Sequence, residues 1–168
     1  EYYDLYPTDI MPKPKLIDPD SELHPWMRNL QRNRNFNDFV NEDIRRRIMA
    51  NYYGCISYVD ANVGKIIDCL DECGLSDDTI IIYTSDHGEN LGTRQIWGKL
   101  NMYEESASIP FLIAGGEIPA GRISNTPVTL ADVAPTIVDA VGLTPLIEAE
   151  SLRGISLMNV ARQADDLE

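Results

Sequence analysis

The chain has 168 residues, of which 43% are hydrophobic and 24% are charged, and its formal net charge is −13. This length and composition are typical of one globular domain with a sizeable hydrophobic core. No run of about 18 apolar residues occurs, so we expect no membrane-spanning helix, and the acidic surplus disfavours nucleic acid as a partner, because like charges repel. The surplus lies in residues 51–168, which hold 18 acidic and six basic side chains. Acidic groups near a cleft favour a cation.

The first 35 residues are rich in proline and polar side chains. Proline can continue neither a strand ladder nor a helix interior, so we expect residues 1–40 to form an irregular segment that wraps along the surface of a larger body. His24 stands next to Pro25 and Trp26, where we expect it to pack or cap rather than bind a ligand. The start of the chain has no signal-peptide pattern and no initiator Met, which suggests an internal piece of a longer protein.

One long helix is predicted over residues 42–73. Apolar side chains recur there every three or four residues, the period of an amphipathic helix with one buried stripe. Asn41 is placed to cap the first turn, Glu42 and Asp43 suit the positive end of the helix dipole, and Gly74 is a natural stop.

Three cysteines, Cys55, Cys69 and Cys73, are too few and odd in number for a disulfide framework. Cys69 and Cys73 lie four residues apart on one face of the predicted helix. We expect them to be buried as small apolar residues, because a metal site made only of cysteines needs more ligands.

Two strands follow, over Thr79–Ser85 and Ile109–Ala114. The continuous Ile-Ile-Ile-Tyr run of the first lacks alternation, as expected for a strand covered on both faces. A helix before the first strand and a long connection to the second fit an α/β architecture. A further helix is predicted from about Leu130 to Val141, in which Pro135 is tolerated only if it lies in the first turn, and residues 144–168 are expected to be irregular.

Asp86, His87 and Lys99 form the candidate site. Ligands collect beyond the carboxyl ends of strands in α/β sheets, where Asp86 and His87 could give an oxygen and a nitrogen to one metal ion. Carboxylate oxygen suits hard cations, and imidazole widens the choice toward manganese, iron or zinc. The Lys99 ammonium could hold the oxygens of a sulfate or phosphate. The alternative is a strand-end pair that caps a helix, beside a lysine in a solvated loop.

A series of motifs resembles the second half of the catalytic domain of the sulfatase family, within the alkaline phosphatase superfamily. The motifs are Asp60-Ala-Asn-Val-Gly64, Gly74-Leu-Ser-Asp-Asp-Thr79, Thr84-Ser-Asp-His-Gly-Glu89, Trp97-Gly-Lys99, Tyr103-Glu-Glu-Ser106, Ile109-Pro-Phe111, Val133-Ala-Pro-Thr-Ile137 and Leu152-Arg-Gly-Ile-Ser-Leu157. The resemblance spans roughly residues 45–157, and its Asp-His form is similar to bacterial choline sulfatases and phosphonate monoester hydrolases.

The resemblance implies an α/β fold that is part of an alkaline-phosphatase-like sandwich, with a mostly parallel sheet covered by helices. Residues 1–168 are then a partial catalytic domain, with its α/β core portion in residues 41–168. By the same resemblance, Asp86 and His87 bind a divalent metal, usually Ca²⁺ in sulfatases, with Mn²⁺ or Zn²⁺ as alternatives. Lys99 becomes the catalytic and substrate-binding contact to the sulfate.

The family's nucleophile has no counterpart in this chain. Sulfatases carry a formylglycine made from the Cys or Ser of a Cys-x-Pro-Ser-Arg type motif, and none of the three cysteines stands in such a motif. The aspartates that complete the family's metal shell have no match either. We therefore expect the formylglycine upstream of this chain, and little or no esterase activity from the 168 residues alone.

Three functions remain open at this point. The first is metal-assisted hydrolysis of a small-molecule sulfate ester, and the second is hydrolysis of a phosphate or phosphonate ester on the same scaffold. The third is a non-catalytic domain that binds a metal or a partner. Strands missing from the sheet would leave an exposed edge, which a second copy of the chain could cover.

Overall fold

The computed structural model describes residues 1–15, 17–18, 22–33, 40–163 and 165–166. The chain forms two compact units. The first contains residues 1–69 and 87–109, and the second contains residues 70–86 and 110–168. Each unit is therefore assembled from two stretches that are separated in sequence.

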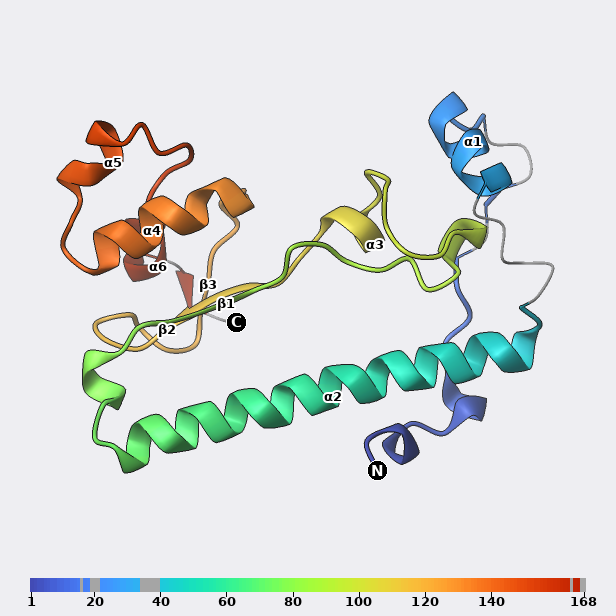
Figure 1. Cartoon of the computed structure of the whole chain (residues 1–168), viewed down its shortest axis with the longest axis horizontal. Helices are drawn as coiled ribbons and strands as arrows, with labels where there is room; N and C mark the ends of the chain where they lie inside the picture. The colour runs from blue at the N-terminus through green and yellow to red at the C-terminus, as the bar shows by residue number, and fades with distance from the viewer. Residues whose placement is uncertain (16, 19–21, 34–39, 164, 167–168) are drawn as a thin grey trace. The chain divides into compact units, whose positions relative to one another are not determined.

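Helix α2, Glu42–Glu72, is one continuous helix of 31 residues (Figure 1). At its start, the side-chain oxygen of Asn41 accepts a hydrogen bond from the Ile44 amide at 2.9 Å. At its end, Gly74 adopts a left-handed φ of +67°, and its amide donates to the carbonyl of Asp71. The predicted helix and both of its end signals are confirmed, because each depends on contacts within a few residues.

The apolar stripe of α2 is largely open to solvent. Its buried residues are Met49, Ala50 and Gly54, whereas Ile56 is 50% exposed and Ile66 is 62% exposed. The prediction of a stripe buried along its length is therefore wrong for this chain, because spacing identifies a helix but does not supply the surface that covers it. Neither α2 nor any other helix in the described ranges is long and apolar enough to cross a membrane.

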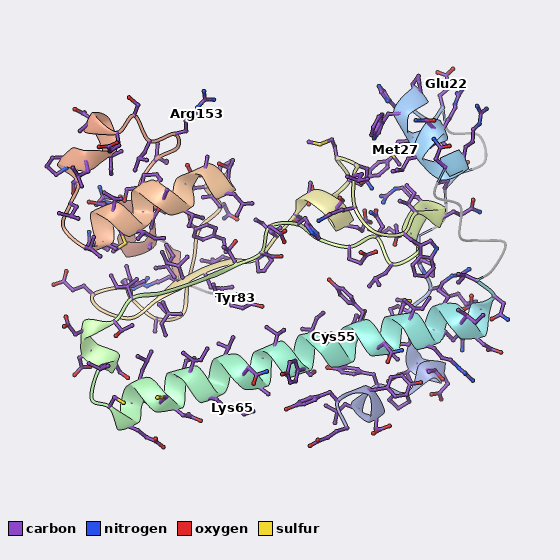
Figure 2. The ribbon with its side chains drawn as sticks, viewed as in Figure 1. Glu22, Met27, Cys55, Lys65, Tyr83 and Arg153 are labelled. Carbon is purple, nitrogen blue, oxygen red and sulfur yellow. The ribbon has the colours of Figure 1, made fainter. Side chains whose placement is uncertain are left out.

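The three cysteines are exposed free thiols. Cys55 projects from the middle of α2 (Figure 2), Cys69 lies near the end of this helix, and Cys73 follows it. The expected burial of Cys69 and Cys73 is wrong, because the end of α2 and the turn that follows it are exposed.

The proline-rich start contains two 3-10 helices, η1 Tyr3–Leu5 and η2 Thr8–Ile10, and the α-helix α1, Pro25–Asn33. Proline is well suited to the first helical position, where its missing N–H is not needed. The Nδ1 of His24 accepts a hydrogen bond from the Trp26 amide at 3.2 Å, which confirms a capping role. The expectation of an irregular segment is wrong at α1, and its residues 16, 19–21 and 34–39 lie outside the described residues.

Two small apolar clusters join this start to the rest of the first unit. Met11 packs against α2, while Met27 and Leu30 of α1 pack against Ile96, and Met27 is labelled in Figure 2. At Gly54 the N-terminal backbone crosses α2 so closely that a Cβ would lie 3.1 Å from a backbone nitrogen. The core of the first unit therefore depends on residues from the start of the chain.

Strands β1, Ile81–Thr84, and β2, Phe111–Ala114, pair side by side in the second unit (Figure 1). They are antiparallel, with Ile81 opposite Ala114. The mixture of helices and a small sheet fits the α/β class, whereas the pairing of β1 with β2 does not itself show the mostly parallel sheet that the resemblance implies. Parallel neighbours need a crossover, usually a helix, whereas the connection here holds only the 3-10 helix η4, Thr93–Gln95, and the four-residue helix α3, Glu104–Ala107.

Short helices make up most of the remaining second unit. They are η3 Ser76–Asp78, η5 Leu130–Asp132, α4 Val133–Ala140, α5 Pro145–Ala149 and α6 Met158–Gln163. A second antiparallel pair joins β3, Arg122–Ile123, to β4, Asp165–Asp166. The predicted helix over Leu130–Val141 is confirmed as η5 followed by α4, with Pro135 in the first turn of α4. The expectation of an irregular end is wrong at α5 and α6.

Asp132 connects these helices. Its buried carboxylate accepts hydrogen bonds from the amides of Thr129 at 2.7 Å and Ile155 at 2.8 Å. The amide of Ile155 and then that of Thr129 are the main causes that hold the pKa of Asp132 below its usual value. The buried hydroxyl of Thr136 accepts from the Leu157 amide at 2.9 Å, so polar contacts fix the chain before α6 against α4.

Candidate functional site

The predicted site residues follow strand β1 directly. Asp86 is exposed and is the last residue of its stretch of the second unit, while His87 is half-buried and opens the next stretch of the first. Lys99 is exposed and lies in the same unit as His87. The chain thus carries all three residues on the connection that leaves β1.

His87 and Lys99 are in direct contact. The Nδ1 of His87 lies 2.8 Å from the carbonyl oxygen of Gly88, and its Nε2 forms a hydrogen bond with the Nζ of Lys99. A carbonyl oxygen can only accept, so Nδ1 carries the proton in this bond. The lone pair of Nε2 then faces the ammonium. This tautomer presents Nε2 as a ligand for a cation, which is the arrangement common to metal-binding histidines.

The residues present offer part of a metal shell. Asp86 has carboxylate oxygens, and His87 has the Nε2 lone pair, so the donor chemistry suits a divalent cation. Within the described ranges, no group of three or more His, Cys, Asp or Glu side chains is placed to hold a metal ion. Two ligands of this kind are compatible with a shell that other residues complete. The approach of the Asp86 carboxylate to the His87–Lys99 pair stays a prediction.

Gly88 brings the backbone after His87 against helix α3. Its amide donates to the carbonyl of Ser106 at 2.9 Å, and a Cβ on Gly88 would collide with the carbonyl oxygen of Glu105. Glycine is required here by the close approach of two backbones.

Arg94 connects the loop to several other segments. Its guanidinium bonds the Glu105 carboxylate at 2.5 Å and lies 4.0 Å from the centre of the Tyr103 ring. Its amide donates to the Lys15 carbonyl at 2.7 Å, and its own carbonyl accepts from the Gln31 side chain at 3.1 Å. Burial alone raises the pKa of Glu105, but hydrogen bonds from its own backbone and from Arg94, with the charges of Arg94 and Lys15, hold it below its usual value.

Three buried polar atoms of the loop have no hydrogen-bond partner among the residues that the structure describes. They are Oδ1 of Asn90, Nε1 of Trp97 and Nδ2 of Asn101. An unpaired buried polar atom costs about 1–3 kcal/mol. These atoms are therefore suited to a bound water or to a polar group that the loop meets in a larger assembly.

The sequence identified two residues that the structure brings together, His87 and Lys99, and missed those that support them. Glu89 and Asn90 both bond the Gly98 peptide, and the Trp26 indole bonds the Leu100 carbonyl at 2.9 Å. The glycine directly before Lys99 was the one local signal for these contacts, because a glycine beside a functional residue often marks a special backbone conformation.

The sequence model of the Sulfatase family matches residues 22–143, which include the whole candidate site. This chain belongs to the sulfatase family. The sulfatase chain is 37% identical over 147 residues to the choline-sulfatase of Rhizobium meliloti (strain 1021), an alignment that covers 86% of this chain and 28% of that protein. It is 38% identical over 140 residues to arylsulfatase K of Bos taurus, covering 83% of this chain and 25% of that protein.

A solved structure is also similar to this sulfatase chain. The phosphonate monoester hydrolase SpPMH from Silicibacter pomeroyi matches with a TM-score of 0.84 and 28% identity, over 99% of this chain and 35% of that chain. The sulfatase chain therefore spans about a quarter to a third of the length of these proteins. The resemblance inferred from the motifs is confirmed, and the family generally uses a divalent metal.

Proposed function

We propose that this chain is the internal to C-terminal part of the catalytic domain of a sulfatase that hydrolyses a sulfuric ester of a small molecule. The observation that carries the proposal is the contact between His87 and Lys99, inside the stretch that matches the Sulfatase family. An imidazole and an ammonium in contact provide one group for a metal and one for the oxygens of an anion.

Each site residue has a distinct role in this proposal. Asp86 and His87 bind the metal, and Lys99 binds the sulfate group of the substrate and stabilises the charge that develops on its oxygens. With a metal bound, the Nε2 of His87 would be one of its ligands, and the Lys99 ammonium would bind the oxygens of the ester. A metal held by Asp86 and His87 would supply further positive charge to stabilise the ester oxygens.

We propose Ca²⁺ as the metal, because carboxylate oxygen prefers hard cations. Mn²⁺ and Zn²⁺ are the alternatives that the imidazole of His87 admits. The remaining ligands and the formylglycine nucleophile come from residues outside this chain. The same proposal makes β1 and β2 part of a larger, mostly parallel sheet in an alkaline-phosphatase-like sandwich. An uncovered edge of that sheet could pair with a second copy of the protein.

The first experiment substitutes Lys99→Ala in the complete sulfatase and measures kcat/KM on an aryl sulfate ester. We expect a loss of about 100-fold or more, the range for a group that stabilises developing charge. Lys65→Ala is the matched control, because Lys65 is exposed on α2 (Figure 2) and lies outside the site. Equal rates for Lys99→Ala and Lys65→Ala would contradict the proposed role of Lys99.

The second experiment measures the metal content of the complete sulfatase and of the Asp86→Asn and His87→Ala variants. Loss of a ligand should reduce the bound metal, whereas Asp77→Asn, an exposed change in η3, should leave it unchanged. A full metal complement in both site variants would remove Asp86 and His87 from the metal shell. Element analysis of the unaltered protein distinguishes Ca²⁺ from Mn²⁺ and Zn²⁺.

A phosphonate or phosphate ester hydrolase is the second candidate function. The TM-score of 0.84 to a phosphonate monoester hydrolase favours it, and sulfate, phosphate and phosphonate present similar oxygens to Lys99. A panel of aryl sulfate, phosphate and phosphonate esters separates the two functions. Much faster turnover of phosphonates than of sulfates would favour the second candidate over the first.

A further inference from the structure

Lys99 lies between two residues, Gly98 and Leu100, whose backbone groups accept hydrogen bonds from side chains or donate them to side chains. Gly98 precedes it with φ +75°, and Leu100 follows it with φ +85°. Both values are in the left-handed region, which is costly for a leucine. A lysine between two such residues has its backbone set by the contacts of its neighbours.

Gly98 is held through both of its backbone polar groups. Its N–H donates to Oε1 of Glu89 at 2.6 Å, and the same oxygen accepts the amide of Leu91 at 3.1 Å. Its carbonyl accepts the backbone amide of Asn90 at 3.0 Å and a second hydrogen bond from the Asn90 side chain. Asn90 is 1% exposed, so its position is fixed by packing as well.

The Leu100 carbonyl is held by a residue far away in sequence. The indole N–H of Trp26 in α1 donates to it at 2.9 Å. Open space surrounds the Cβ position of Gly98, so glycine is favoured here by the backbone conformation and not by a close contact. The stretch from Gly98 to Leu100 is thus fixed at both ends while the Lys99 side chain stays exposed.

We propose that Glu89 is a positioning residue for Lys99, acting through the backbone of Gly98 together with Asn90, while Trp26 holds the carbonyl of Leu100. This inference rests on the proposed function of Lys99. The carboxylate that follows His87 by two residues fixes the backbone from which Lys99 reaches His87. Glu89 thereby couples the two parts of the candidate site.

The first test measures amide hydrogen exchange of Gly98 in the complete sulfatase. Glu89→Ala removes the acceptor and should speed exchange of the Gly98 amide by about tenfold or more, because the amide opens locally. Glu89→Gln keeps an oxygen acceptor and should preserve most of the protection. Unchanged exchange of Gly98 in Glu89→Ala would overturn the inference.

The second test is a double-mutant cycle in the complete sulfatase, with kcat/KM on an aryl sulfate ester as the readout. Glu89→Ala should lower kcat/KM by about 10- to 100-fold, the range for residues that orient a functional side chain through hydrogen bonds. Glu89→Gln should restore most of the lost activity. In the Lys99→Ala background, Glu89→Ala should change the rate by less than about twofold, because its effect passes through Lys99.

Two controls separate positioning from general damage. Glu104→Ala removes an exposed carboxylate of α3 and should leave kcat/KM within about twofold of the unaltered enzyme. Trp26→Phe keeps an aromatic ring but loses the indole N–H, and its effect should also vanish in the Lys99→Ala background. Additive losses from Glu89→Ala and Lys99→Ala would overturn the inference. Full activity of Lys99→Ala alone would instead overturn the proposed function.

Discussion

Helix α2 and the loop of residues 88–106 are built in opposite ways. The helix has regular hydrogen bonds and local end signals, yet only three of its 31 residues are buried. The loop holds no helix longer than four residues, yet it buries Asn90, Ile96 and Ser106 and bonds the N-terminal segment. A regular element can thus be independent of its surroundings, while an irregular one depends on contacts that are distant in sequence. Substitutions should therefore be tolerated in α2 and costly in the loop.

The largest expected effect is that of Gly88→Ala. A Cβ there collides with the Glu105 carbonyl, so the backbone must shift and the Gly88–Ser106 hydrogen bond is lost. We expect the free energy of unfolding to fall by about 3 kcal/mol or more, as for other changes that force a backbone apart. Urea unfolding measures it, and a loss below about 1 kcal/mol would mean that the loop accommodates side chains as easily as the helix does.

Arg94→Ala should have the second largest effect. It removes the 2.5 Å bond to Glu105, whose side chain is 20% exposed, and the contact with the Tyr103 ring. We expect a loss of about 2 kcal/mol, typical of a partly buried hydrogen bond to a charged group. Arg45→Ala is the matched control in α2, because Arg45 pairs with Glu42 one turn away, and it should cost only about 0.5 kcal/mol. Equal costs would remove the contrast between the two regions.

The pH dependence of stability should differ between the unaltered chain and Glu105→Gln. The pKa of Glu105 is lowered in the folded chain, so the unfolded chain binds the proton more readily. The stabilisation from the carboxylate is complete above the ordinary pKa of about 4.3 and is lost as the pH falls through the lowered value. Thermal unfolding between pH 3 and pH 7 should show a shallower acid decline for Glu105→Gln. Parallel profiles would contradict this role of Glu105.

The smallest expected effect has the opposite sign. Gly64 lies inside α2 with nothing within 4 Å of its Cβ position, so Gly64→Ala adds helix propensity without a clash. We expect a gain of about 0.5–1 kcal/mol in the free energy of unfolding. A loss of stability would mean that a side chain at position 64 makes unfavourable contacts, although the space around Gly64 is empty in the structure.

Structural features that depend on residues close in sequence could be predicted. Asn41 stands directly before α2 and Gly74 two residues after its end, and Pro135 lies in the first turn of α4, where a helix tolerates proline. The Asp-His pair at the end of β1 and the lysine twelve residues later pointed to the contact between His87 and Lys99. Each of these signals depends on short-range stereochemistry or on a family motif, so it can be recognised without knowledge of the fold.

Features that depend on distant contacts could not be predicted. Leu91, Arg94, Gln95 and Leu100 all have positive φ, which no rule based on residue type would assign to them. The antiparallel pairing of β1 and β2 follows from the path of the connection rather than from the composition of either strand. Helix α5 is a different case. Pro145 at its start is a local helix signal, although residues 144–168 were expected to be irregular.

The hydrogen bond between Trp26 and Leu100 has a practical consequence for anyone who shortens this chain. A boundary chosen from sequence alone would fall just before the long helix, near Asn41, and the shortened product would keep every conspicuous motif. It would also lack the indole that stands 74 residues before its acceptor, together with Met27 and Leu30, which pack against Ile96. Expression boundaries for this protein should therefore follow spatial contacts, because the apparent leader is part of the support of Lys99.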